Sequence, residues 1–94
     1  TASKSGIIHL TKHLAKTLVN RNIIVNAIAP GPFDSHMLGK AVNFDYSFIA
    51  EYVPRKRIGS PEDIAGLCMY LCSRAGAYTI GETITCDGGL AKLL

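Results

Sequence analysis

A Pro-Gly-Pro turn after an apolar run is the first stretch of this 94-residue chain that could do chemistry. The run from Ile23 to Ala29 is rich in β-branched residues, which is typical of a strand buried on both faces in a parallel sheet. Pro30 cannot continue a hydrogen-bonded ladder, and Gly31 lets the backbone turn tightly or approach a ligand closely. Ligands of open parallel sheets bind beyond the carboxyl ends of the strands, so this turn is a candidate binding loop. An ordinary turn after a core strand would use the same residues.

His9 and His13 are four residues apart on a predicted helix and could in principle hold zinc. The stretch between them lacks the catalytic Glu of the metalloprotease helix and places Lys12 beside the pair. A solvated polar helix face explains this pattern better, and the sequence predicts no metal site.

The chain has three cysteines, Cys68, Cys72 and Cys86. Their number is odd, and Cys68 and Cys72 lie four apart on the apolar face of a predicted helix. Buried free thiols fit this spacing better than disulfides or a metal site, and free thiols are typical of a reducing compartment. We therefore expect a cytoplasmic protein.

Composition and charge argue against several classes of partner. The apolar fraction is 48%, typical of a folded, soluble domain, and no apolar run approaches the length of a membrane span. The net charge is +3, and the densest basic run, Arg55–Arg57, has no aromatic residues between its charges. A solvated loop explains that run better than a nucleic-acid interface does. We expect neither nucleic acid nor a membrane as a partner.

Three helical segments are predicted around the turn. Apolar residues recur every three or four positions from Ser3 to Val19, which predicts an amphipathic helix ended by the turn formers Asn20–Asn22. The segment His36–Val53 has no clean period and predicts one or two irregular helices whose apolar side could cover a pocket or a partner surface. Ser60–Asp63 is a helix start, with a hydroxyl at the N-cap, then proline, then acids in the first turn. The buried face of that last helix is predicted to hold Ile64, Leu67, Cys68, Leu71 and Cys72.

A second strand is predicted at Glu82–Cys86, where polar and β-branched residues alternate between glycine turns. Strands separated by helices predict a parallel α/β sheet. Since two strands make a poor sheet, this piece should need further strands beside it. The chain also opens at Thr1 without an initiator Met or a signal-peptide pattern, so we expect a fragment of a longer protein.

Four motifs of the chain resemble, in order and spacing, the C-terminal half of a short-chain dehydrogenase/reductase. They are Thr1–Gly6, Val25–Gly31, Arg57–Ala65 and Gly81–Gly89. Within that family the chain looks most like the 3-oxoacyl-acyl-carrier-protein reductases. The resemblance implies a Rossmann-type, doubly wound parallel sheet, with residues 1–94 as the C-terminal half of one domain and the cofactor-phosphate half outside the chain. It also implies NAD or NADP as cofactor and hydride transfer to or from a carbonyl or alcohol carbon.

The resemblance gives Lys4 a catalytic role. In the family a Tyr stands four residues before this Lys, which would place it immediately before Thr1. An ammonium near a phenol favours the phenolate and lowers the pKa of the phenol, while its other donors can bind the ribose hydroxyls of the cofactor. Without that Tyr, residues 1–94 alone are expected to be inactive.

The resemblance also implies that the loop after the first strand lines the nicotinamide. Pro30 and Gly31 match the family's Pro-Gly pair. Phe33, two beyond the glycine, would bind the carboxamide through its backbone, and Ser35 stands where the family has a Thr that reaches the cofactor. Phe33 replaces a more usual branched aliphatic residue, and Ser35 keeps the hydroxyl without the methyl.

The expected partners are a small-molecule or acyl-thioester substrate and further copies of the same chain, in a homodimer or homotetramer. Neither NAD versus NADP nor the substrate can be read from these residues. One alternative is a catalytically silent Rossmann-fold module for binding or assembly. Another is an independent regulatory domain, which is disfavoured because the strand Ile23–Ala29 looks built to be covered on both faces.

Overall fold

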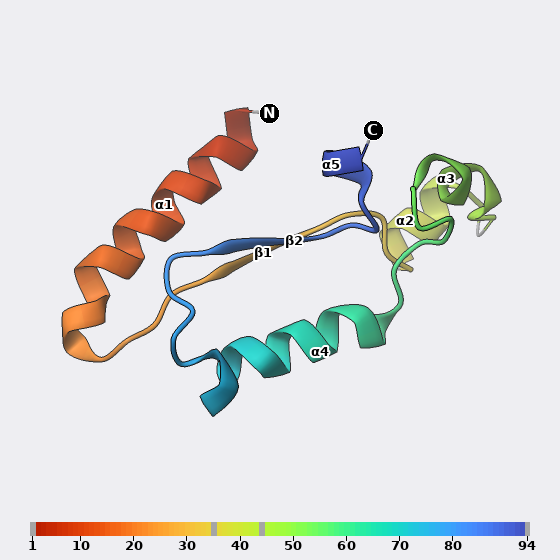
Figure 1. Ribbon diagram of the computed structural model, residues 1–94. Helices are drawn as coiled ribbons and strands as arrows, with labels where there is room; N and C mark the ends of the chain where they lie inside the picture. The colour runs from red at the N-terminus through yellow and green to blue at the C-terminus, as the bar shows by residue number, and fades with distance from the viewer. Residues whose placement is uncertain (1, 35, 44, 94) are drawn as a thin grey trace. The chain divides into compact units, whose positions relative to one another are not determined.

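The computed structural model describes residues 2–34, 36–43 and 45–93. The described elements alternate helical and extended segments along the chain (Figure 1). Their order is α1 (Ala2–Leu18), η1 (Val19–Arg21), β1 (Ala27–Pro30), α2 (His36–Ala41), α3 (Ser47–Tyr52), α4 (Pro61–Cys72), η2 (Arg74–Gly76), β2 (Thr83–Cys86) and α5 (Leu90–Leu93). Among these helices, none is long and apolar enough to cross a membrane.

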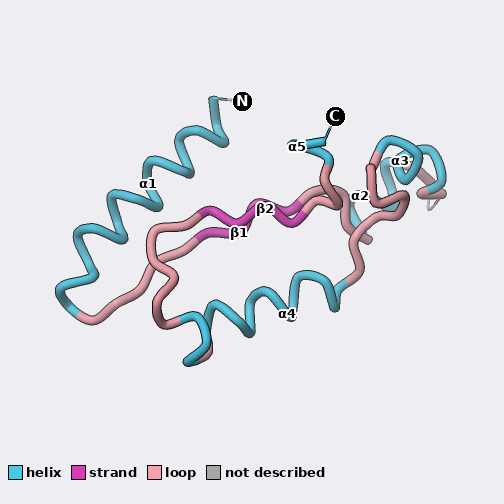
Figure 2. Tube along the Cα trace, viewed as in Figure 1, coloured by secondary structure: helices cyan, strands magenta, loops and turns pink. Residues whose placement is uncertain are grey.

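The two strands β1 and β2 form a parallel pair, and Figure 2 shows them running side by side. The N–H of Ala27 donates to the carbonyl of Glu82 (2.8 Å), and the N–H of Gly31 donates to the carbonyl of Cys86 (3.0 Å). From the first bond to the second, the donor and the acceptor each move four residues toward the C-terminus, as they do in parallel strands. The predicted α/β class and parallel pairing are confirmed.

The side chain of Asn26 fixes where this pairing begins. Its Nδ2 donates to the carbonyl of Thr79 (2.8 Å), and its Oδ1 accepts the N–H of Glu82 (3.0 Å). One amide therefore ties the start of β1 to the loop that leads into β2. Satisfying a backbone donor and acceptor in this way is what an Asn side chain, with one acceptor and two donors, can do.

The predicted first strand began too early. Ile23 and Ile24 lie outside β1 and are 46% and 41% exposed, and the strand starts only at Ala27. One backbone hydrogen bond precedes the strand, from the N–H of Gly81 to the carbonyl of Val25 (2.8 Å), but regular strand geometry begins only at Ala27. β-Branched composition marks residues suited to a strand, but the paired length depends on the partner.

Helix α1 forms as predicted and continues into η1, which ends at Asn22, where the backbone is left-handed (φ 61°) and the N–H donates to the carbonyl of Val19. Its covered side, however, differs from the predicted apolar stripe. Thr11 and Ala15 are buried, whereas Ile7 and Leu10 are 52% and 51% exposed. Ala15 lies against the turn at Gly81, where an added Cβ would be 3.4 Å from the Ala15 Cβ. Only a narrow line of the helix is therefore covered by described residues.

Helix α4 starts where the sequence predicts, at Pro61 after Ser60. Leu67 and Leu71 are half-buried, but Cys68 and Cys72 are exposed. The thiols are free, as expected, while the expectation that these two are buried is wrong. The described residues therefore leave the positions of Cys68 and Cys72 on α4 uncovered.

The chain divides into two compact units, Thr1–Ile28 with Leu67–Ile84, and Ala29–Gly66 with Thr85–Leu94. The second unit holds α2 and α3, so the segment predicted to form one or two irregular helices forms two, and Val53 is buried in this unit. The short helix α5 was not predicted from the sequence. It is capped by Asp87, whose carboxylate accepts the N–H groups of Gly89 (2.9 Å) and Ala91 (3.0 Å).

Candidate active site

The turn after β1 is packed against the end of β2. A Cβ added to Gly31 would lie 2.5 Å from the Cβ of Asp87 and 2.8 Å from its Cα. Such distances are far inside van der Waals contact, so only glycine fits without movement of the backbone. The close approach expected at Gly31 is therefore one between two segments of the chain itself.

Phe33 forms an isolated parallel bridge with Gly59, and this bridge fixes the orientation of the loop. The N–H of Gly59 donates to the carbonyl of Pro32 (2.8 Å), and the N–H of Asp34 donates to the carbonyl of Gly59 (3.0 Å). In a parallel bridge of this form, the N–H and C=O of the middle residue point away from the partner. Among the described residues, neither backbone group of Phe33 has a hydrogen-bond partner. Phe33 thus presents one donor and one acceptor on the side away from Gly59.

The ring of Phe33 lies over Gly59. A Cβ on Gly59 would meet three ring atoms of Phe33, the nearest at 2.4 Å. The aromatic ring is therefore accommodated because the facing position, Gly59, has no side chain. The bridge leaves the N–H and C=O of Phe33 open to a ligand, and this does not depend on the position of the ring.

A cavity of about 720 Å³ opens along this loop. One part of its lining is the loop itself, a second comes from α2 and a third from the start of α4. The lining residues are Pro30, Gly31, Pro32, Phe33, Asp34, Leu38, Ala41, Pro61 and Ile64. The walls are mostly apolar, with the carboxylate of Asp34 as the charged group, which suits a small organic ligand with an apolar part.

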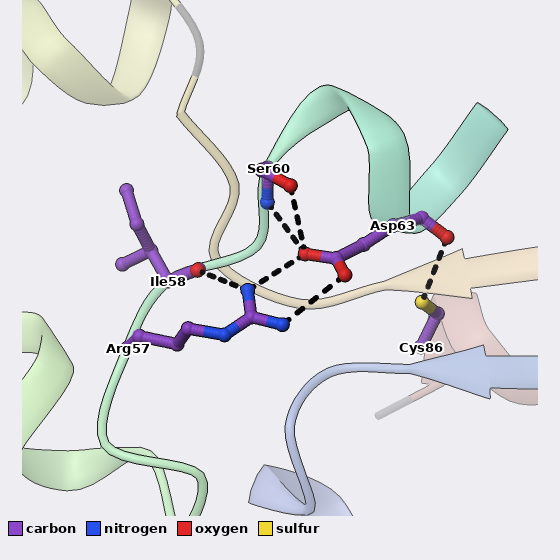
Figure 3. A network of polar contacts seen from close by, with 5 residues as sticks. All are labelled: Arg57, Ile58, Ser60, Asp63 and Cys86. Carbon is purple, nitrogen blue, oxygen red and sulfur yellow. Dashed lines mark hydrogen bonds and ion pairs between the residues drawn. The ribbon is translucent and has the colours of Figure 1, made fainter. Parts of the chain in front are cut away.

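A network centred on Asp63 holds the segment that carries Gly59 (Figure 3). The Arg57 guanidinium pairs with both carboxylate oxygens of Asp63, at 2.7 and 3.1 Å. Oδ2 of Asp63 also accepts the N–H of Ser60 (2.7 Å) and its hydroxyl (3.2 Å). The Sγ of Cys86 lies 3.9 Å from the carbonyl of Asp63. The start of α4 is thus tied both to the loop before it and to the end of β2.

This network lowers the pKa of the Asp63 carboxyl far below its ordinary value of 3.8. The largest cause is the hydrogen bond from Arg57, followed by the backbone hydrogen bond from Ser60. Both donors favour the charged carboxylate. Asp63 therefore stays ionised at every pH at which the protein is expected to work.

The predicted site residues are distributed over both units. Pro30, Gly31 and Phe33 lie together in the second unit along the cavity. Lys4 lies in the first turn of α1, in the first unit, with an exposed side chain, and its catalytic placement stays a prediction. Ser35 lies outside the described residues. Among the residues that the structure describes, no group of three or more metal-ligating side chains lies together.

Two parts of the site were missed by sequence reasoning. Arg57 lies in the basic loop that the sequence predicts to be solvated and is 49% exposed, but sequence reasoning did not assign its ion pair with Asp63. The spacing Ser60-x-x-Asp63 is that of a capping box and would have assigned the carboxylate to the N–H of Ser60. Gly59 was also not assigned, and no signal in the sequence pairs it with Phe33, 26 positions earlier.

Nearly the whole chain is similar to known proteins. A family model described as enoyl-(acyl carrier protein) reductase matches residues 1–91, and the solved structures that match include a short-chain dehydrogenase from Bacillus anthracis. The chain belongs to the short-chain dehydrogenase/reductase family. The match covers all four motifs on which the resemblance was based, from the first helix to the turn after β2.

Two curated relatives are named as reductases of acyl thioesters. The chain is 40% identical over 93 residues to the 3-oxoacyl-[acyl-carrier-protein] reductase FabG of Aquifex aeolicus, covering 96% of this chain and 36% of that protein. It is 41% identical over 90 residues to the acetoacetyl-CoA reductase of an Acinetobacter species, with 96% and 36% covered. The chain thus spans little more than a third of the length of these relatives.

Two solved structures that match carry NADP in their descriptions. The RhlG/NADP active-site complex of Pseudomonas aeruginosa superposes with a TM-score of 0.86 at 38% identity, covering 99% of this chain and 38% of that one. A putative 2-deoxy-D-gluconate 3-dehydrogenase of Agrobacterium tumefaciens with bound NADP gives 0.81 at 39% identity, with 96% and 37% covered. The likeness establishes a Rossmann-type fold for the chain.

Proposed function

We propose that the full-length protein is an NAD(P)-dependent reductase of 3-oxoacyl thioesters, with residues 1–94 as the C-terminal part of one Rossmann-type domain. The observation that carries this proposal is the outward-facing N–H and C=O of Phe33 beside a cavity of about 720 Å³. The chain's role is to hold the nicotinamide end of the cofactor and one wall of the substrate space.

The backbone of Phe33 fits the carboxamide of nicotinamide. A primary amide carries one acceptor oxygen and one donor nitrogen, and a single residue with a free N–H and a free C=O can bind both. The bridge to Gly59 uses the other side of the loop, so binding would break no hydrogen bond of the described chain. When bound, the reduced cofactor supplies a hydride to the substrate carbonyl. The loop residues bind and orient the ring that carries it.

Lys4 would lower the pKa of the phenol that donates a proton to the substrate oxygen during hydride transfer. An ammonium four residues from a phenol on one helix shares a face with it and lowers its pKa, which makes the phenol a better proton donor near neutral pH. We expect a Tyr immediately before Thr1 for this purpose. The gene sequence upstream of Thr1 decides this point, and any residue without a phenol there would argue against the enzyme.

The apolar lining supports an acyl substrate. Leu38, Ala41 and Ile64 give the cavity aliphatic walls, and the named relatives of similar identity include reductases of acyl-carrier-protein and CoA thioesters. NADP is favoured as the cofactor because two matching structures are described with it. The free thiols of the chain support a reducing compartment such as the cytoplasm.

The rival proposal is a Rossmann-fold module that binds a partner without catalysis. An assay of the purified full-length protein separates the two, with NADPH and acetoacetyl-CoA as probes and loss of NADPH absorbance as the readout. The reductase proposal expects turnover with NADPH that saturates in acetoacetyl-CoA. NADPH binding without turnover of this or longer 3-oxoacyl-CoA probes would favour the silent module.

A further inference from the structure

A side-chain hydrogen bond spans the segment that carries α2. The hydroxyl of Tyr46, at the start of α3, donates to Oδ1 of Asp34 at 2.7 Å. Asp34 is one of the loop residues that line the cavity of about 720 Å³. The bond therefore closes the chain from residue 34 to residue 46 into a ring, with α2 inside it.

The ring places two residues of α2 in the wall of the cavity. Leu38 and Ala41 line it together with the loop residues Pro30 to Asp34. Helix α2 is only six residues long, and a helix of this length is not stable on its own. Its position against the loop thus depends on what ties its two ends.

Tyr46 is itself held firmly enough to act as a tie. Oδ1 of Asp45 accepts the N–H of Ser47 (3.1 Å) and its hydroxyl (2.7 Å), which begins α3 directly after Tyr46. The carbonyl of Tyr46 accepts the N–H of Ala50 (2.9 Å). The chain turn between α2 and α3 is set by Asn43, which has a left-handed backbone (φ 55°). The backbone of Tyr46 is therefore fixed by neighbouring contacts, and its phenol is the group that reaches back.

The Asp34 carboxylate also keeps the phenol in its donor form. A hydrogen bond to a carboxylate is stronger than one between neutral groups, and ionising the phenol would place two negative charges together. Accordingly, the hydrogen bond to Asp34 raises the pKa of Tyr46 above its ordinary value of 10.0. The tie is thus intact across the neutral range.

We propose that Tyr46 is a positioning residue for the substrate, acting through Asp34 to hold α2 as a wall of the cavity. This inference rests on the proposed function, because it takes the cavity as the substrate space. The cofactor would be bound by the backbone of Phe33, which the bridge to Gly59 holds independently. Loss of the tie should therefore weaken substrate binding and leave cofactor binding unchanged.

The test uses the full-length protein with Tyr46→Phe, and Tyr52→Phe as its matched control. Tyr52 lies in α3, its ring packs edge-on against Phe48 at 5.2 Å between centroids, and its hydroxyl has no hydrogen bond among the described residues. With NADPH and acetoacetyl-CoA, Tyr46→Phe is expected to raise the KM for acetoacetyl-CoA about fivefold, the usual scale for one lost hydrogen bond, with kcat and the Kd for NADPH unchanged. Tyr52→Phe should behave as wild type. Asp34→Ala should reproduce the Tyr46→Phe effect, and the double variant should add nothing further.

Amide hydrogen exchange gives a readout that does not depend on activity. Exchange in residues 36–52 should rise in Tyr46→Phe and stay at the wild-type level in Tyr52→Phe. If both the exchange and the KM are unchanged in Tyr46→Phe, the hydrogen bond from Tyr46 to Asp34 does not hold α2 in place. Faster exchange with an unchanged KM would overturn the role in substrate positioning. A wild-type protein without turnover would count against the proposed function, and the exchange result would still decide whether the tie exists.

Discussion

Gly31 and Asp87 approach so closely that a Cβ on Gly31 would lie 2.5 Å from the Cβ of Asp87. The turn after β1 and the turn after β2 are therefore packed backbone against backbone. This contact places the start of the proposed nicotinamide loop relative to the end of the neighbouring strand.

Substitution of Gly31 by alanine should be destabilising. Gly31→Ala is expected to lower the free energy of unfolding by about 1–3 kcal/mol, the usual cost of forcing a group into a packed site. The matched control is Gly66→Ala, because Gly66 lies within α4 and a Cβ there would meet nothing within 4 Å. Alanine at that position should be neutral or stabilising by up to about 1 kcal/mol. Denaturant unfolding of both full-length variants checks the difference, and equal stability of the two would contradict the packing account.

The Arg57–Asp63 pair should make stability depend on pH in the acid range. The pKa of Asp63 is lowered in the folded state, so its contribution is complete above its ordinary value of 3.8 and is lost as the pH falls through the lower folded value. Asp63→Asn should therefore reduce Tm near neutral pH, and the difference from wild type should shrink below about pH 4. Glu62→Gln, at the adjacent exposed position, controls for the loss of one charge in the first turn of α4. A difference between wild type and Asp63→Asn that stays constant from neutral pH into strong acid would argue against this pair.

The sequence predicts the helices of this chain well wherever the signal is local. Ser60 and Pro61 mark the start of α4 because capping and a fixed φ act within one turn. Contacts between distant residues could not be read in the same way. The ring of Phe33 over Gly59 and the bond from Tyr46 to Asp34 depend on how the chain returns to itself, and composition carries no record of that.

The errors have a common physical cause. The residues around Ile23 and the thiols Cys68 and Cys72 are predicted to be buried, since their pattern marks them as suited to a core, but they are exposed. Burial depends on what lies against them, and the described sheet has two strands. The pattern indicates which residues are suited to burial. Which of them are actually buried depends on the elements that lie against them.

Loss of the Lys4 ammonium should disable the proposed chemistry. In the full-length protein, Lys4→Met is expected to lower kcat by about two orders of magnitude or more, because the proposed role of the ammonium is to tune the phenol and bind the ribose. Lys12→Met, an exposed lysine farther along α1, should leave kcat unchanged. Steady-state kinetics at several pH values provide the measurement. Unchanged turnover in Lys4→Met would make Lys4 an ordinary surface lysine.

The full-length protein is predicted to be a homodimer or homotetramer. Leu93 at the C-terminal end is 72% exposed, and α1 leaves Ile7 and Leu10 half exposed. Burial of apolar area contributes roughly 25 cal/mol per Å², so a few such side chains favour association by a few kcal/mol. Sedimentation velocity at micromolar concentration should give a species of at least twice the monomer mass. A single monomeric species would contradict this prediction.

The proposed contact between the backbone of Phe33 and the nicotinamide carboxamide can be measured by titration of the full-length protein with NADPH. Phe33→Pro removes the outward N–H, which bonds no described residue, while Phe33→Leu removes only the ring and keeps that donor. Circular dichroism first establishes that both variants are folded. We predict that Phe33→Leu binds NADPH with nearly the wild-type Kd and that Phe33→Pro binds it at least about tenfold more weakly, the scale of one lost hydrogen bond to a buried ligand. Equal NADPH affinity in the folded Phe33→Pro variant would contradict the account.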